Sequence, residues 1–210
     1  MKKNRTRVMT AALLSFLIIL FTAFAPAAPA GLCEVMDEMP KLVEYTAPEN
    51  YFKCRLPAGW TPYDRVFGLS AEEKKVFGIT LLGPDQGSPV TPALTAHYYA
   101  PGNLLHDNMD VFIGRHARPA LGYAIAGKSY GEVQNIEAAG RKAKAFERID
   151  IRFTGERLNA AKISIFEKYV VVPALQNDGF YVLKLSVPAT AKDKFTGMFE
   201  EVVKSFTPEK

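Results

Sequence analysis

The stretch YFKCRLPAGW, residues 51–60, alternates apolar and polar side chains and then breaks at a proline and a glycine. A period of two predicts a β-strand, with Phe52, Cys54 and Leu56 facing a core. The Pro-Ala-Gly segment ends the strand, and Trp60, the only tryptophan of the chain, is expected to fold back over the edge of that core. The stretch is therefore predicted to be scaffold rather than a reactive site.

Further strands and one internal helix are expected downstream. The candidate strands are 75–82, 93–100, 131–138, 142–153, 164–172 and 180–187, with residues 83–92 as a long surface connection. In the fourth strand, alternation places Ala143, Ala145, Ile149, Ile151 and Phe153 on one face. Glu147 falls among them, where an ion pair with a basic neighbour is favoured over a titrating site.

The clearest element is the C-terminal segment TAKDKFTGMFEEVVKSF, residues 190–206. Its large apolar residues share one helical stripe: Phe195, Met198, Phe199, Val202 and Phe206. Thr190 and Asp193 approximate a capping box at its start. This pattern predicts an amphipathic helix that packs on the sheet.

Three segments resemble the PsbP-like family. They are YFKCRLPAGW, then IEAAGRKAKAFE at 136–147, and then GFYVLKLSVPA at 179–189 with the helix that ends in Ser205 and Phe206. The resemblance implies an α+β fold, a single domain in which an antiparallel β-sheet is flanked by helices as an α/β/α sandwich. It also implies a mostly non-catalytic module that docks on other proteins, since that is what members of the family do, some with reported metal binding.

The first thirty residues have the order of a secretory signal. Basic MKKNRTR precedes an apolar run and then APAAPA, which favours cleavage after Ala30, with Ala27 as the second choice. Retention as an anchor and lipidation at Cys33 stay open as alternatives, although Leu32 stands where a lipoprotein signal has a small residue. The expected organisation is a signal over 1–30, a tail over 31–50 and one domain over 51–207, in the periplasm or outside the cell.

Removal of the signal takes away four of the 26 basic residues and no acidic one, so 22 of each remain. The neutral remainder gives no reason to expect nucleic acid as a partner, and it contains no apolar run of membrane-spanning length. Two cysteines in an exported chain suggest a disulfide between Cys33 and Cys54. The alternative is a buried Cys54 thiol and an unpaired Cys33.

No catalytic motif is present: the sequence has no nucleophile elbow, phosphate-binding loop or zinc-ligand spacing. We therefore expect no enzyme, with a hydrolase as the remote alternative, and no cofactor. The segment HDNMD offers a weak alternative, a divalent metal ion held by His106, Asp107 and Asp110. Capping of a helix at about 109–117 by Asp107 or Asn108 explains the same residues and is preferred.

Loop aromatics are the remaining functional hint. Tyr63, Phe67, Tyr123 and Tyr130 lie beside glycines and prolines that would present them on turns. The sequence therefore predicts a non-enzymatic exported domain that docks on an envelope protein with these aromatics and one sheet or helix face. A periplasmic protein that binds a small ligand or metal through residues 106–110 is the second hypothesis.

Overall fold

The computed structural model describes residues 39–63, 68–120, 122–123, 125–155, 161–175 and 179–209. The predicted signal, Cys33 and Phe67 lie outside these residues, so export and the Cys33 pairing stay predictions. None of the helices in the described part of the chain is long and apolar enough to cross a membrane.

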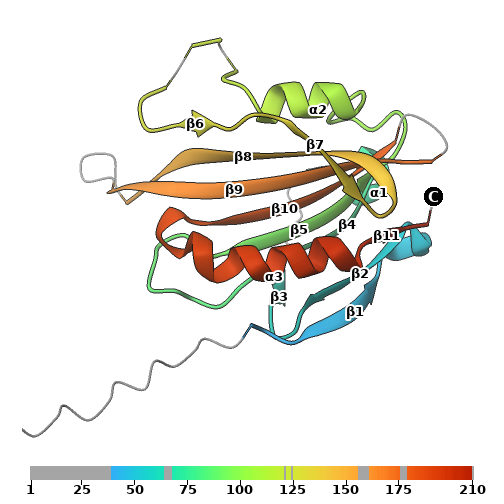
Figure 1. Ribbon diagram of the computed structural model, residues 1–210, viewed down its shortest axis with the longest axis horizontal. Helices are drawn as coiled ribbons and strands as arrows, with labels where there is room; N and C mark the ends of the chain where they lie inside the picture. The colour runs from blue at the N-terminus through green and yellow to red at the C-terminus, as the bar shows by residue number, and fades with distance from the viewer. Residues whose placement is uncertain are drawn as a thin grey trace, which may run out of the picture. The chain divides into compact units, whose positions relative to one another are not determined.

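An antiparallel sheet forms the centre of the fold (Figure 1). Its strands are β3 (Thr61–Pro62), β4 (Val76–Leu82), β5 (Ala93–Tyr99), β6 (Ser129–Tyr130), β7 (Gln134–Ala138), β8 (Arg141–Thr154), β9 (Ala161–Pro173) and β10 (Phe180–Pro188). They lie in the order β3-β4-β5-β10-β9-β8-β6, and β7 pairs with the first part of β8. The sheet confirms the strands expected from alternation, and β9 pairs with β10 in antiparallel orientation.

A second, three-stranded sheet consists of β1 (Leu42–Thr46), β2 (Phe52–Pro57) and β11 (Thr207–Pro208), in the order β1-β2-β11. The strand β2 lies within the stretch YFKCRLPAGW, and its alternate residues are buried as predicted. The expected tail over 31–50 is wrong for its described part. Leu42 and Tyr45 pack on the core, and β1 pairs with β2 over five residues, because the β2 edge needs a hydrogen-bonding partner.

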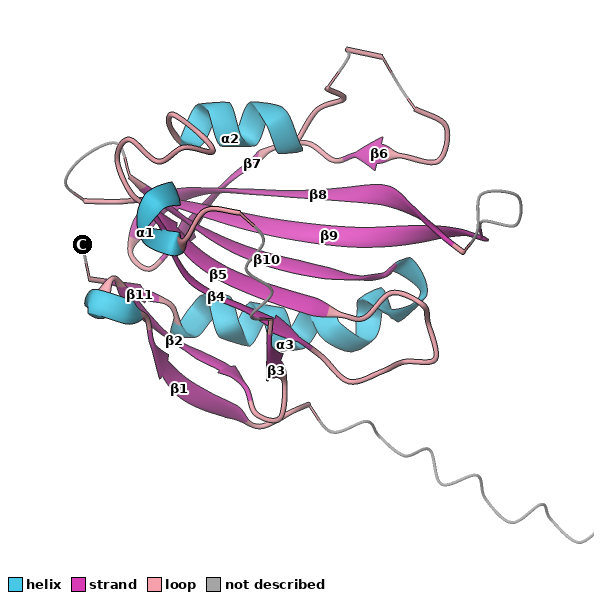
Figure 2. Cartoon of the chain, turned by 180° about the vertical axis from the view of Figure 1, so that it is seen from behind, coloured by secondary structure: helices cyan, strands magenta, loops and turns pink. Residues whose placement is uncertain are grey.

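Helices cover the two faces of the main sheet. They are α1 (Ala71–Lys74), α2 (Met109–His116) and α3 (Lys192–Ser205). Figures 1 and 2 show α2 above one face of the sheet and α3, together with the small sheet, on the other. The architecture confirms the predicted α+β class, an antiparallel sheet flanked by helices.

The ends of the two longer helices test the capping predictions. The Asn108 side chain accepts a hydrogen bond from the Val111 amide at 3.0 Å, which confirms the cap of α2. The predicted capping box of Thr190 and Asp193 is wrong. A 3-10 turn over Ala189–Ala191 leads directly into α3, so Thr190 lies inside that turn and Ala191 is the cap residue, with no side-chain hydrogen bond.

Two apolar cores lie on opposite faces of the sheet. The larger one, under α3 and the small sheet, contains the predicted helical stripe, Phe195, Met198, Phe199, Val202 and Phe206. Trp60 covers its edge, with its ring edge-on to Phe195 at 5.8 Å. The smaller core, under α2, consists of Tyr99, Phe112, Ala117, Phe146, Tyr169, Val171, Phe180 and Val182.

One predicted core position is wrong. The Phe153 residue is 70% exposed, although alternation places it with Ala145 and Ile149. The register explains this, because β10 ends where Pro188 pairs with Ile165. The last residues of β8 and the first of β9 extend beyond it as a two-stranded ribbon, and no third strand of the described residues continues the core there.

Candidate functional site

The predicted docking aromatics do not form one patch. Tyr63 follows β3, whereas Tyr130 lies in β6, and these strands are at opposite ends of the main sheet. Tyr123 is 60% exposed in the connection between α2 and β6. Phe67 is outside the described residues. Alternation and turn signals identified exposed aromatics, but they could not show that the sheet separates them.

The residues of the metal hypothesis are also placed differently from that hypothesis. Among the residues that the structure describes, no three His, Cys, Asp or Glu side chains are grouped so that they could hold a metal ion. The His106 ring packs edge-on against Phe112 at 4.8 Å and against His116 at 5.4 Å. Asp110 lies in the first turn of α2, next to the Asn108 cap. The arrangement is that of a capped helix start beside an aromatic cluster.

Cys54 is a buried free thiol in β2. Burial raises the pKa of this thiol to about 12, so it is protonated and unreactive at neutral pH. Its partner in the predicted disulfide, Cys33, lies outside the described residues.

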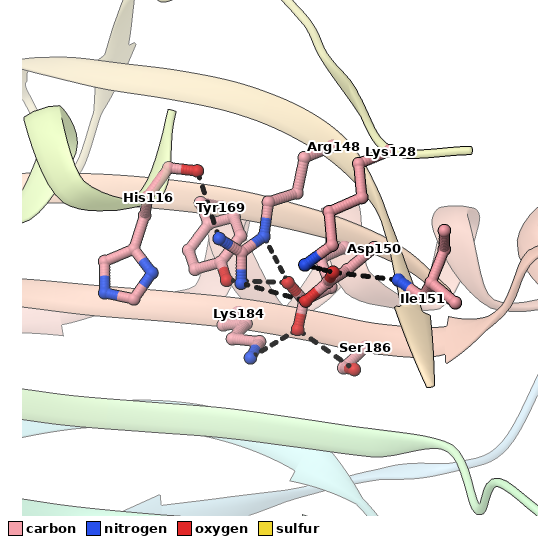
Figure 3. Close-up of polar contacts among 9 residues, drawn as sticks. His116, Lys128, Arg148, Asp150, Ile151, Tyr169, Lys184 and Ser186 are labelled. Atoms are coloured by element: carbon pink, nitrogen blue, oxygen red, sulfur yellow. Dashed lines mark hydrogen bonds and ion pairs between the residues drawn. The ribbon is translucent and has the colours of Figure 1, made fainter. Parts of the chain in front are cut away.

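A buried charged cluster lies beneath the C-terminal end of α2 (Figure 3). Glu167 is at its centre, on the α2 face of β9, with a side chain only 4% exposed. The strand register brings Arg148 of β8 and Ser186 of β10 opposite it. Because these strands are neighbours in the sheet, three segments distant in sequence contribute to one set of contacts.

The Glu167 carboxylate is fully engaged. One oxygen accepts hydrogen bonds from Arg148 Nε at 2.5 Å and from the Tyr169 hydroxyl at 2.9 Å. The other oxygen lies 2.6 Å from Lys184 Nζ and accepts from the Ser186 hydroxyl at 3.4 Å. Burial by itself would raise the pKa of Glu167, but Lys184 and Arg148 outweigh burial and lower this pKa to about 2.

The cluster also anchors α2. Arg148 Nη1 donates a hydrogen bond to the His116 carbonyl oxygen at 3.2 Å, at the end of the helix where partial negative charge accumulates. Lys128 pairs with Asp150 at 2.6 Å on the same face. These contacts connect β8, β9, β10 and the end of α2, so the cluster stabilises the position of the helix on the sheet.

Neutral histidines border this cluster. Burial, followed by the positive charge of Lys184, lowers the pKa of His97 to about 4. Burial and Arg148 are the main causes that lower the pKa of His116 to about 4. A carboxylate with a pKa near 2 and imidazoles with a pKa near 4 are poor proton carriers at neutral pH, because each stays in one protonation state.

An open groove of about 440 Å³ lies on the opposite face of the sheet, against α3. We call it the α3 groove. It is lined by Gly131, Glu132, Gln134, Ile136, Ala145, Phe146, Glu147, Lys168, Val170, Phe199, Glu200, Val203 and Lys204. Its apolar residues come from β7, β8, β9 and α3, so only the tertiary fold brings them together.

Ion pairs border the α3 groove. Lys168 Nζ lies 3.5 Å from a Glu147 oxygen and 3.2 Å from a Glu200 oxygen, so it connects the sheet to the helix. Lys192 lies 3.8 Å from the other Glu147 oxygen. The predicted pairing of Glu147 with a basic neighbour is confirmed.

Sequence reasoning missed the charged cluster and the groove. Glu167 did carry a usable signal, because alternation places it with Ile165, Tyr169 and Val171 on a buried face. A lone carboxylate at such a position indicates a buried ion pair. No comparable signal marks the groove, whose walls come from separate segments.

Comparison with known protein families finds no match, and neither does comparison with curated proteins. Among solved structures, the fold is similar to that of cyanobacterial PsbP from Synechocystis sp. PCC 6803. The match covers 86% of this chain and 99% of that one, at 16% sequence identity and a TM-score of 0.44. This likeness is one of fold alone, and it is to the same family that the sequence motifs resemble.

Proposed function

We propose that this protein is a non-catalytic, exported binding domain that docks on another protein of the cell envelope through the α3 groove. The observation that carries the proposal is the groove itself. It has an apolar floor that includes Ile136, Ala145 and Val203, and it is open to solvent rather than filled by the chain's own side chains. Open apolar surface of this kind is typical of binding sites.

The groove has the anatomy of a protein interface. An apolar centre is surrounded by charged residues, and Lys168 and Lys192 hold the rim carboxylate of Glu147 in place. Burial of an apolar partner side chain in the groove removes it from water, which favours binding. The charged residues of the rim orient the partner. Their ion pairs are weak because they are partly exposed, so they can be replaced by ion pairs with the partner at low cost in free energy.

A binding role without catalysis is supported by the state of the other polar residues. Glu167 is saturated by four donors, and the thiol of Cys54 is buried and protonated. Catalysis of acyl transfer or hydrolysis needs a nucleophile and a base with a pKa near the working pH. Glu167 and Cys54 are instead each held in one protonation state at neutral pH.

Site-specific photo-crosslinking in cells of the native host tests this proposal. A photoreactive phenylalanine analogue replaces the half-buried Val203 in the groove, and a matched probe replaces the exposed Leu104, which precedes α2. We expect a discrete crosslinked protein from position 203 and none from position 104.

The captured protein is then tested with purified components. Val203→Lys places a charge in the groove and should abolish co-purification, whereas Leu104→Lys should leave it intact. Equal capture at both positions, or co-purification that survives Val203→Lys, would refute docking through the groove.

A further inference from the structure

The strand β7 forms part of the sheet edge beside the α3 groove. Within the described part of the chain, its only strand partner is β8. Gln134, Asn135 and Glu137 are exposed, so at these positions the edge is open to solvent in the described part of the chain. An uncovered edge presents backbone N–H and C=O groups that can pair with another extended chain.

The two faces of β7 differ in what they offer an added strand. Gln134 and Ile136 line the α3 groove, because they are on the same face as Ala143 and Ala145 of β8. A strand added to β7 would lie about 4.8 Å from it and would place every second side chain over the groove. Those positions favour apolar residues.

The opposite face is cationic. Lys142 and Lys144 of β8 pair in register with Glu137 and Asn135 of β7, whereas Arg141 alternates onto the groove face, where it pairs with Ala138. A second hollow, at the turn between β7 and β8, is lined by Asn135, Ile136, Glu137, Gly140, Arg141 and Lys142. Two lysines face one carboxylate here, so the intervening positions of an added strand favour Asp or Glu.

We propose that β7 accepts an extended segment of the protein partner in which apolar residues alternate with acidic ones. The apolar side chains enter the α3 groove, and the acidic side chains face Lys142 and Lys144. Main-chain hydrogen bonds to β7 contribute affinity, and the alternation gives specificity. This inference rests on the proposed docking function and specifies the kind of segment that docks.

Synthetic peptides test the inference on the full-length protein. The probe is Ac-GEVEIEVEG-amide, and the control is the same peptide with lysine in place of each glutamate. NMR measures the amide hydrogen exchange rate of each residue, and a titration with each peptide gives its affinity. We expect the acidic peptide to slow exchange in β7 and to bind at least tenfold more tightly than the lysine peptide.

Charge reversal gives the second arm. Lys142→Glu combined with Lys144→Glu should lower the affinity for the acidic peptide at least tenfold and raise the affinity for the lysine peptide. The matched control, Lys41→Glu with Lys74→Glu, reverses one exposed and one half-buried lysine elsewhere and should change neither affinity. Absence of protection in β7 with the acidic peptide, or equal affinities for both peptides, would overturn strand addition.

The Val203 crosslink separates this inference from the proposed function. If the Lys142 and Lys144 double variant still forms the crosslink at full yield, strand addition is overturned while docking in the groove stands. If the crosslink is lost in the double variant and kept in the Lys41 and Lys74 control, strand addition is supported. A wild-type protein that forms no crosslink at position 203 refutes groove docking, whatever the peptides show.

Discussion

Replacement of Glu167 by glutamine should strongly destabilise the protein. The variant keeps the shape of the side chain but leaves Arg148 and Lys184 without the buried charge that both contact. Removal of one partner from a buried ion pair costs about 3–5 kcal/mol. The pKa of Glu167 leads to a similar number: a decrease from 4.5 to about 2 corresponds to about 3 kcal/mol of stability at neutral pH.

The pH dependence gives this prediction a specific signature. A carboxylate with a lowered pKa in the folded state contributes its full stability above pH 4.5 and loses it as the pH falls toward 2. The difference in the free energy of unfolding between wild type and Glu167→Gln should therefore be about 1.4 kcal/mol smaller at pH 3.5 than at pH 7. Urea unfolding, followed by the fluorescence of the buried Trp60, measures this free energy for both proteins at each pH.

Glu147→Gln is the matched control. The Glu147 side chain is also paired with lysines but is 42% exposed, so its loss should cost less than about 1 kcal/mol. If Glu167→Gln costs no more than this control at pH 7, the charged cluster does not stabilise the packing of α2 on the sheet.

Four further predictions concern stability and reactivity. The pKa of His97 and that of His116 are each lowered from 6.5 to about 4, so the unfolded state binds more protons in this window. Stability should fall as the pH drops from 6.5 to 4, by at most about 3 kcal/mol per histidine, and replacement of either histidine by glutamine should flatten the slope of urea midpoints against pH. With the chain's other cysteine replaced by serine, Cys54 should resist a thiol reagent at pH 8 until urea unfolds the protein; rapid labelling of the folded state would contradict its burial. Gly78→Ala should cost about 2–5 kcal/mol, because φ is +134° and the new Cβ would lie 2.1 Å from a backbone oxygen. Gly114→Ala in α2 meets open space and should instead stabilise by about 0.5–1 kcal/mol in thermal unfolding.

The sequence determined the elements with a strong local period. The alternation in β2 and the apolar stripe of α3 follow from geometry within one segment, since a strand repeats every two residues and a helix every 3.6. The cap of α2 was likewise predictable, because Asn108 bonds to an amide three residues away. These periods, with the family resemblance, were enough for the α+β class.

Only the tertiary structure decided which residues meet. The strand register places Glu167 between Arg148 and Ser186. It also places Phe153 beyond the end of β10, where its side chain is exposed. Strand order places Tyr63 and Tyr130 at opposite ends of the sheet, against the expectation of one aromatic patch.

The proposed binding site belongs to this second class. Ile136 and Val203 are 67 positions apart in sequence, yet both line the α3 groove. A local pattern shows which face of a segment is apolar, but it contains no information on which other segment covers that face. Whether apolar residues end in a closed core, as Val202 does, or in an open groove depends on how many segments pack around them, and that is settled only when the whole chain folds.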